Sequence, residues 1–235
     1  PTVLRPLTLP ALLDRLLAPP ASPATVVVCA DRASFVAALA RALQPQGTRP
    51  GRGLQQRLAP TVHTLSVARH VGLAFCPSVQ ALLAFLAAYG RPRQAHGQHG
   101  AESGGGAALV LVNLLALHKP TPSFSAQGLS RAFAAAVDAA ARTGAALQLV
   151  ECEDWQQAGE LDPAVLDPAV LPPADDAAMS DGDPDDRMHD PWDQDVSILN
   201  VSARRFGSAA GERSWAGRTV TAERIAARWF RFQHL

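Results

Sequence analysis

Short apolar runs recur along the first 150 residues and are separated by segments with helical spacing of apolar residues. Each run is rich in Val, Leu or Ala and too short for a buried helix, which predicts strands buried on both faces. The run at 108–115 is the most continuous and suits the centre of a parallel sheet. The predicted strands are 25–29, 71–76, 108–115 and 147–150.

The segments between these runs predict helices. In 126–142, Leu129, Phe133 and Val137 share one face, and Gly144 supplies an end signal. Further helices are expected over 31–43, 60–70 and 79–89. Strands that alternate with helices indicate a parallel sheet with right-handed crossovers and helices on both faces.

The second half of the chain begins with an acidic segment. Residues 1–150 contain 13 Lys or Arg and 4 Asp or Glu, residues 151–195 contain 1 and 15, and residues 196–235 contain 7 and 2. The acidic segment also holds a proline-containing tandem repeat, Leu161–Val165 and Leu166–Val170. Such a composition cannot form a core, so we expect a flexible insert over 156–191 that follows a parallel α/β core over 1–155.

After the insert, three short runs predict antiparallel strands that complete the same domain over 192–235. These runs are 196–201, 218–221 and 228–232, with loops at 207–217 and around Glu223. The leucine-rich piece from Leu4 to Leu17 either packs on this domain or is held by a partner, and the pattern alone does not distinguish the two.

Composition excludes several classes of protein. No run approaches the roughly 18 apolar residues that a membrane-spanning helix requires, and the first residues lack the design of a signal peptide. Cys29, Cys76 and Cys152 lie too far apart to indicate a disulfide framework or a zinc site. We therefore expect a protein of the nucleus or cytoplasm without membrane partners.

The order of elements resembles the RecA-type ATPase fold, a three-layer α/β sheet whose last strands turn antiparallel. The likeness is strongest to recombinase paralogues and their degenerate relatives, among them subunits of Shu-type recombination complexes and the RecA-like accessory subunits of Elongator. It is carried by the strand ending at Asn113, the helix 126–142, the strand 147–150 and the closing segment from Arg218 to Phe232.

The residues needed for nucleotide cleavage by that fold are missing. A glycine-rich loop with Lys and Ser or Thr is required to hold phosphates and magnesium, but the predicted first strand at 25–29 is followed by Asp31, Arg32 and Ser34. Neutral Asn113 stands where a magnesium-orienting carboxylate is expected. The resemblance therefore implies a degenerate nucleotide site, with no cofactor and no catalytic residues.

A thiol enzyme is the alternative from another functional class. Cys76 and His118 both fall at or beyond carboxyl ends of predicted strands, as do Asp31 and Asn113, and open α/β sheets bind ligands there. An imidazole can generate a thiolate nucleophile. No local signature surrounds Cys76, and a cysteine there also fits a small buried hydrophobe.

Two loops could be mistaken for metal sites. His96 and His99 have a His-x-x-His spacing but lack further ligands, so solvated loop histidines are the favoured interpretation. The acidic run Asp181–Asp186 lacks the glycine and glutamate that a calcium loop requires at its sixth and twelfth positions. We expect no metal.

Arginines and aromatic residues alternate in the carboxyl-terminal segment, a combination that pairs with phosphates and stacks on bases. A subunit interface or a core strand with surface arginines is the competing interpretation, favoured over direct contact with nucleic acid. The candidate nucleic-acid-binding residues are Arg204, Arg205, Arg213, Arg218, Arg228, Trp229 and Arg231.

The sequence thus favours a non-catalytic RecA-like subunit of a multiprotein complex, in homologous-recombination DNA repair. The expected partner is another RecA-like subunit or a SWIM-domain protein, with DNA as a further candidate. An Elongator-type scaffold for tRNA modification is the nearest alternative, and a Cys-dependent hydrolase is the alternative of another class.

Overall fold

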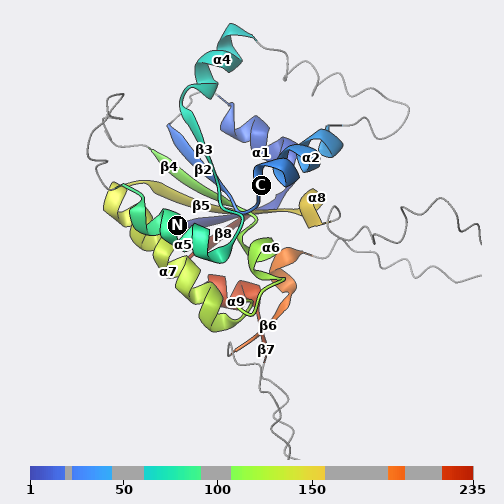
Figure 1. Cartoon of the computed structure of the whole chain (residues 1–235), viewed down its shortest axis with the longest axis vertical. Helices are drawn as coiled ribbons and strands as arrows, with labels where there is room; N and C mark the ends of the chain where they lie inside the picture. The colour runs from blue at the N-terminus through green and yellow to red at the C-terminus, as the bar shows by residue number, and fades with distance from the viewer. Residues whose placement is uncertain (19–22, 44–60, 91–106, 157–189, 199–218, 235) are drawn as a thin grey trace, which may run out of the picture.

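The computed structural model describes residues 1–18, 23–43, 61–90, 107–156, 190–198 and 219–234. A six-stranded sheet, parallel throughout, runs through the middle of the molecule in the order β3-β2-β4-β5-β1-β8 (Figure 1). This confirms the α/β class. The strands are β1 (Thr2–Leu7), β2 (Ala24–Val28), β3 (Val71–Phe75), β4 (Ala108–Val112), β5 (Ala146–Cys152) and β8 (Arg231–His234).

Helices cover both faces of the sheet. One face packs against α1 (Leu9–Leu16), α2 (Arg32–Ala42) and the short α8 (Glu153–Gln156). The other face packs against α5 (Val79–Ala88), α7 (Ala126–Thr143) and α9 (Ala222–Ala226). Helix α4 (Val62–Ala68) precedes β3, and α6 (Leu114–His118) follows β4.

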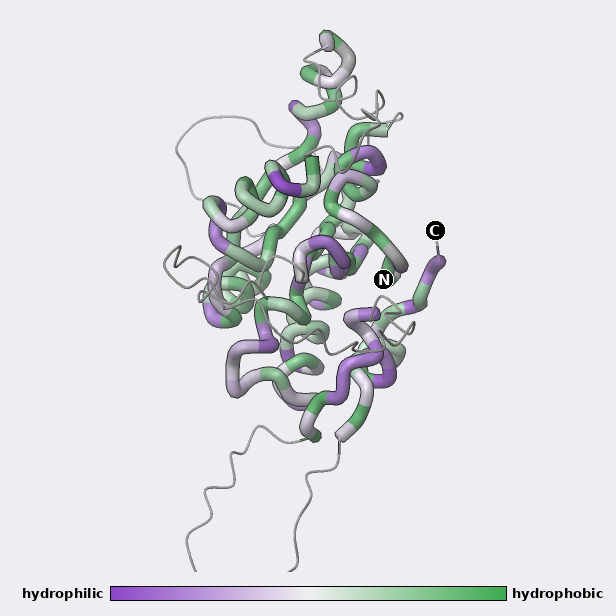
Figure 2. The backbone as a smooth tube through the Cα atoms, turned by 90° about the vertical axis from the view of Figure 1, so that its right-hand side faces the viewer, coloured by the Kyte–Doolittle hydropathy of each residue, from purple (hydrophilic) through white to green (hydrophobic). Residues whose placement is uncertain are grey.

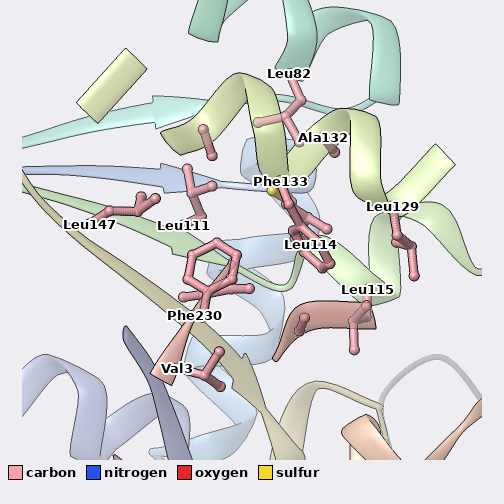
Figure 3. Packing of buried hydrophobic residues seen from close by; sticks show 14 of the residues in the cluster. Val3, Leu82, Leu111, Leu114, Leu115, Leu129, Ala132, Phe133, Leu147 and Phe230 are labelled. Atoms are coloured by element: carbon pink, nitrogen blue, oxygen red, sulfur yellow. The ribbon is translucent and has the colours of Figure 1, made fainter. Parts of the chain in front are cut away.

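The core lies in two layers because strands buried on both faces alternate their side chains between them. On the α5/α7/α9 face, Phe133 meets Phe230 edge to face at 5.3 Å, with Leu111 and Leu82 also fully buried (Figure 3). On the α1/α2/α8 face, Phe35 packs beside Phe75 at 5.8 Å. Figure 2 shows the hydrophobic residues gathered along the strands and the helices that cover them.

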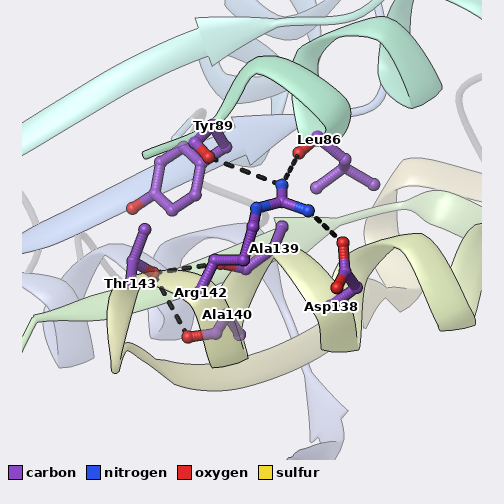
Figure 4. A network of polar contacts seen from close by, with 7 residues as sticks. All are labelled: Leu86, Tyr89, Asp138, Ala139, Ala140, Arg142 and Thr143. Carbon is purple, nitrogen blue, oxygen red and sulfur yellow. Dashed lines mark hydrogen bonds and ion pairs between the residues drawn. The ribbon is translucent and has the colours of Figure 1, made fainter. Parts of the chain in front are cut away.

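Polar contacts join α5 to α7 at the edge of the larger core layer. The guanidinium of Arg142 pairs with Asp138 one turn earlier and donates to the carbonyl oxygen of Leu86 at 2.7 Å (Figure 4). Gly144 ends α7 in a left-handed conformation, φ 65°, as the sequence predicts. The carboxyl ends of α5 and α7 are thereby held together.

The amino-terminal piece belongs to the domain. Strand β1 lies inside the sheet between β5 and β8, and α1 contributes Leu9 and Leu12 to the core. This answers the question that the leucine pattern left open. The run at 25–29, which was expected to be the first strand, is therefore the second strand along the chain.

The carboxyl-terminal region differs in part from the expected antiparallel strands over 192–235. A separate pair, β6 (Asp195–Ser197) and β7 (Thr219–Thr221), is antiparallel. Strand β8 instead joins the main sheet parallel to β1, and α9 replaces the loop expected around Glu223.

The predicted strand 108–115 ends three residues early. Asn113 adopts a left-handed conformation, φ 61°, and α6 begins at Leu114. Asparagine tolerates this conformation better than other residues with a side chain, which makes it a suitable residue for the break. Leu114 and Leu115 stay fully buried, so their apolar character reflects burial in a helix rather than in a strand.

The acidic insert expected over 156–191 lies outside the described residues from 157 to 189. Its two ends are folded: Gln156 closes α8, and Asp190 precedes a 3₁₀ turn, η2 (Pro191–Asp193), in which Trp192 is fully buried. Within the described ranges, no helix has the length and apolarity to cross a membrane.

Candidate functional site

A pocket of about 320 Å³ lies at the carboxyl edge of the sheet. Its walls are the segments that follow β2, β3 and β4, together with Trp155 of α8. After β2 the chain turns into α2 on one face, and after β4 it turns into α6 and α7 on the other. The pocket therefore lies at a topological switch point, where open α/β sheets bind ligands.

The pocket combines apolar walls with a few polar groups. Apolar surface comes from residues such as Val79, Leu117 and Pro120. The polar and aromatic groups come from four different connections and converge on one space. They are Asp31, Ser34, Ser78, Gln80, Thr121 and Trp155.

Side chains of the protein itself occupy the helix N-termini at this edge. Asp31 accepts from the Ser34 N–H at 2.9 Å at the start of α2, and Ser78 accepts from the Ala81 N–H at 3.2 Å at the start of α5. Both oxygens of Asp154 accept from the Leu9 N–H of α1, at 2.9 and 3.0 Å. At each of these three helices, one N–H group that could bind an anion is therefore engaged by an oxygen of the chain itself.

Glu151 also accepts a hydrogen bond from a helix N-terminus, that of α6, but its side chain is buried. Its Oε1 accepts from the Leu115 N–H at 2.7 Å, and its side chain is almost fully buried at the end of β5. Loss of solvation disfavours the ionised form and raises the pKa of Glu151 to about 8, although the backbone N–H donors act in the opposite direction. The group is therefore largely protonated at neutral pH.

Asn113 lies beside this carboxyl. Its Oδ1 accepts from the Cys152 N–H at 2.8 Å, whereas its Nδ2 is buried without a hydrogen-bond partner. The side chain thus links the end of β4 to the end of β5 through its Oδ1.

The residues of the expected degenerate nucleotide site separate into two groups. Asp31 and Ser34 line the pocket, whereas Arg32 is an exposed residue at the start of α2 and Asn113 is buried. The true first strand, β1, is followed by Thr8, which caps α1, and by Leu9 and Pro10. That connection also lacks the glycine and lysine of a phosphate-binding loop.

Cys76 and His118 do not form a nucleophile pair. Burial raises the pKa of the Cys76 thiol, opposite to the direction that a thiolate nucleophile requires. His118 is fully buried, its Nδ1 bonds the Leu114 carbonyl oxygen at 2.8 Å, and its Nε2 has no partner. The two side chains therefore share no hydrogen bond.

The structure describes three of the candidate nucleic-acid-binding residues. Arg228 and Arg231 are exposed, at the turn after α9 and on the edge strand β8. Trp229 is half-buried against the core, with its Nε1 buried and unpaired, so its ring is not presented as a free stacking surface. Phe230, between these arginines, and Phe232, directly after them, pack inward against Phe133 and Trp192.

Other candidates lie outside the described residues. These are Arg204, Arg205, Arg213 and Arg218 of the arginine-rich segment, His96 and His99, and the acidic run Asp181–Asp186. Among the described residues, no group of three or more His, Cys, Asp or Glu side chains is placed to hold a metal ion.

Sequence reasoning missed three residues at the carboxyl edge of the sheet and one buried cation that lies outside the pocket lining. Glu151 lies at the end of β5, and Asp154 and Trp155 lie in α8, whereas composition placed all three at the beginning of the acidic region 151–195. Arg5 lies on β1, where its guanidinium pairs with Asp190 at 3.2 Å and Glu223 at 3.4 Å. A carboxylate directly after a buried strand was an available signal for Glu151, because such a position opens at the ligand-binding edge.

Comparison with known proteins yields no relative: no family model, no curated protein and no solved structure matches this chain.

Proposed function

We propose that this chain is a non-hydrolysing RecA-like subunit of a multiprotein complex that acts in homologous-recombination DNA repair. Its role is to bind partners, with another RecA-like subunit or a SWIM-domain protein as the first candidates. The context of DNA repair rests on the resemblance in the order of the core elements from β4 through α7 to β5, without support from the closing strand β8, which runs parallel to β1. The loss of nucleotide chemistry rests on the carboxyl edge of the sheet.

One observation carries the proposal. Three of the helix N-termini at the carboxyl edge are held by carboxyl groups of the chain, Asp31 at α2, Glu151 at α6 and Asp154 at α1, whereas the hydroxyl of Ser78 caps α5. A nucleotide phosphate would have to displace these oxygens from the N–H groups, and it would meet the negative charge of Asp31 and Asp154. Such an edge opposes the binding of a phosphate.

A nucleotide titration tests the loss of nucleotide chemistry. We expect a fluorescent ATP analogue with magnesium to bind more weakly than about 1 mM, the range of non-specific contacts. Saturable binding at micromolar concentration would overturn the proposal, since it would show that a phosphate site exists despite these carboxyl groups.

Affinity capture of the tagged protein from its native extract tests the role as a subunit. Recombinase-like or SWIM-domain proteins in stoichiometric amounts support the proposal, and Elongator subunits would replace it with a tRNA-modification scaffold. A protein recovered without any stoichiometric partner would contradict both.

DNA binding is tested on the exposed arginines of the carboxyl-terminal segment. If Arg228 and Arg231 contact phosphates, each change to alanine weakens binding of single-stranded DNA and lowers the slope of log affinity against log salt by about 1. Arg41→Ala is the matched control, because it removes the same charge from exposed α2 on the opposite layer. Equal effects of all three variants would show that Arg228 and Arg231 make no specific contact with DNA.

A further inference from the structure

The switch-point pocket has the chemistry of a receptor for a cation. Its lining within the described residues includes the carboxylate of Asp31 and the indole of Trp155, and it includes no lysine or arginine. A pocket with a negative group, an aromatic wall and no positive charge favours a cationic occupant over a phosphate.

Asp31 is ionised and has acceptor capacity to spare. The hydroxyl and N–H of Ser34 donate to separate oxygens of the carboxylate, at 2.6 and 2.9 Å, and hold its pKa below the usual range. Each carboxylate oxygen can accept a second hydrogen bond. Because the group is exposed at the mouth of the pocket, an incoming donor can reach both oxygens.

Trp155 supplies an aromatic wall. Its ring packs beside Phe35, with centroids 6.2 Å apart, and is half-buried, so the indole is held in place at the pocket. A guanidinium is planar and weakly hydrated, stacks on an indole and offers paired N–H donors to a carboxylate, whereas an ammonium acts only as a point charge.

The surroundings of Trp155 reinforce the preference for a cation. Glu153 and Asp154 precede it in α8, and Asp190, which also pairs with Arg5, lies close enough to act on Glu153. Partial burial and then the repulsion from Asp190 and Asp154 raise the pKa of Glu153. A positive charge brought to this edge relieves that repulsion.

We propose that the switch-point pocket receives an arginine side chain of a partner protein, with its guanidinium stacked on Trp155 and hydrogen-bonded to Asp31. The inference rests on the proposed function for the nature of the occupant, a partner subunit. The pocket's preference for a guanidinium can be measured without that partner.

The first test uses N-acetyl-arginine amide as the probe and the indole N–H signal of Trp155 in NMR as the readout. Trp155→Phe assigns the signal among the four tryptophans of the chain. We expect a saturable shift with a millimolar Kd, and at least about fivefold weaker binding of N-acetyl-citrulline amide, which has the same shape without the charge. Equal binding of the two probes would overturn the proposal.

Two variants locate the effect. Asp31→Asn keeps the N-cap, since asparagine caps helices as well as aspartate does, and it is expected to weaken arginine binding about fivefold or more. Asp195→Asn, the same change at an exposed position on β6, is expected to have no effect. Unchanged binding in Asp31→Asn would sink the proposal.

An adenosine titration and affinity capture of the partner are the two remaining tests. A shift of the Trp155 signal by adenosine but not by the arginine probe would assign the pocket to a nucleoside and overturn the inference. In affinity capture, Asp31→Asn is expected to lower recovery of a stoichiometric partner while Asp195→Asn does not, and equal recovery would contradict an arginine supplied by that partner. Failure of the arginine probe with partners still recovered overturns this inference alone, whereas micromolar ATP binding overturns the proposed function.

Discussion

Glu151 is a buried acid whose protonation is linked to folding. In the unfolded chain the carboxyl ionises near 4.5, whereas in the folded protein its pKa is raised to about 8 by burial. The folded state therefore holds a proton that the unfolded state has released. Since stability falls with pH wherever the native state binds more protons, this residue lowers the free energy of unfolding as pH rises from about 4.5 to 8.

Glu151→Gln is expected to remove that dependence. The variant keeps an oxygen for the Leu115 N–H and cannot ionise, so its free energy of unfolding relative to the parent should rise with pH. The difference in free energy of unfolding between the variant and the parent should rise by at most about 1.4 kcal/mol per pH unit, the limit for one proton. Urea unfolding at pH 5, 6.5 and 8 measures it, with Asp193→Asn as an exposed control. The same pH profile for Glu151→Gln and the parent would show that Glu151 titrates normally.

Arg5 is the buried cation that joins the carboxyl-terminal elements to β1. It pairs with Asp190 before η2 and Glu223 of α9, and its guanidinium carbon lies 4.4 Å from the centre of the Phe232 ring on β8. Its Nη2 has no hydrogen bond, so the contact with Glu223 at 3.4 Å is Coulombic. One side chain on β1 thus contacts three segments of the carboxyl-terminal region.

Arg5→Ala is expected to lower the free energy of unfolding by about 2–4 kcal/mol, because it leaves a cavity and two carboxylates without their cation. Arg15→Ala on the exposed side of α1 should change it by less than about 0.5 kcal/mol. Denaturant unfolding compares the two. Similar small losses would show that the contacts of Arg5 contribute little.

Among the elements, the first turn of α7 packs so closely on the preceding loop that there is room only for a glycine at position 128. Ser125 caps the helix by accepting from the Gly128 N–H at 3.1 Å. A Cβ at Gly128 would lie 2.1 Å from the carbonyl oxygen of Ser123, a backbone atom that cannot rotate away. The glycine therefore allows the loop after α6 to lie against the first turn of α7.

Gly128→Ala is expected to destabilise the protein by about 1–3 kcal/mol despite the higher helix propensity of alanine, because the loop must move. Gly72→Ala on β3 is the control, since its nearest contact would be an ordinary 3.9 Å. Thermal unfolding of both variants distinguishes the two sites. A Gly128→Ala variant as stable as the parent would show that the loop yields without cost.

Element boundaries followed from local patterns where a periodicity and an end signal coincided. Helix α7 was expected over 126–142 and extends over Ala126–Thr143, because an apolar stripe, a serine and a glycine all mark it. The break at Asn113 was not predicted. The left-handed conformation of Asn113 ends the strand inside a run of apolar residues. The apolar pattern continues on both sides of Asn113, so the hydrophobic periodicity does not reveal where the strand ends.

At the scale of the whole molecule, the amino-terminal strand is part of the sheet's interior. Val3 is fully buried between β5 and β8, whereas Leu73 on the edge strand β3 is 56% exposed. Both residues lie in short apolar strands, yet their burial differs because the strand order places one inside the sheet and the other at its margin.

Val3→Ser is expected to lower the free energy of unfolding by about 2–4 kcal/mol, since it removes apolar contacts and buries a hydroxyl. Leu73→Ser should cost less than about 1 kcal/mol, because the side chain is already largely in water. Chemical denaturation measures both. Equal losses would contradict the placement of β1 within the sheet.

The carboxyl-edge pocket is likewise formed only by the assembled sheet. Asp31 was placed at the end of a strand from the sequence, and the structure puts it there. Its neighbours in the pocket, Gln80, Thr121 and Trp155, come from three other connections of the chain. Only the order of strands brings these connections together, so the partners of Asp31 could not be deduced from spacing.

The sequence by itself determined the α/β class, the alternation of strands and helices over most of the core, and the absence of a glycine- and lysine-containing phosphate loop. These follow from local periodicity, caps and residue identity, which depend on neighbours a few positions away. The tertiary structure decided that β1 lies inside the sheet, that β8 runs parallel to it, and that carboxyl groups from α8 and β5 occupy the N-termini of α1 and α6. Those features depend on pairing between segments more than a hundred residues apart or on different strands, and the hydrogen bonds and buried faces that select such pairings exist only in the assembled fold.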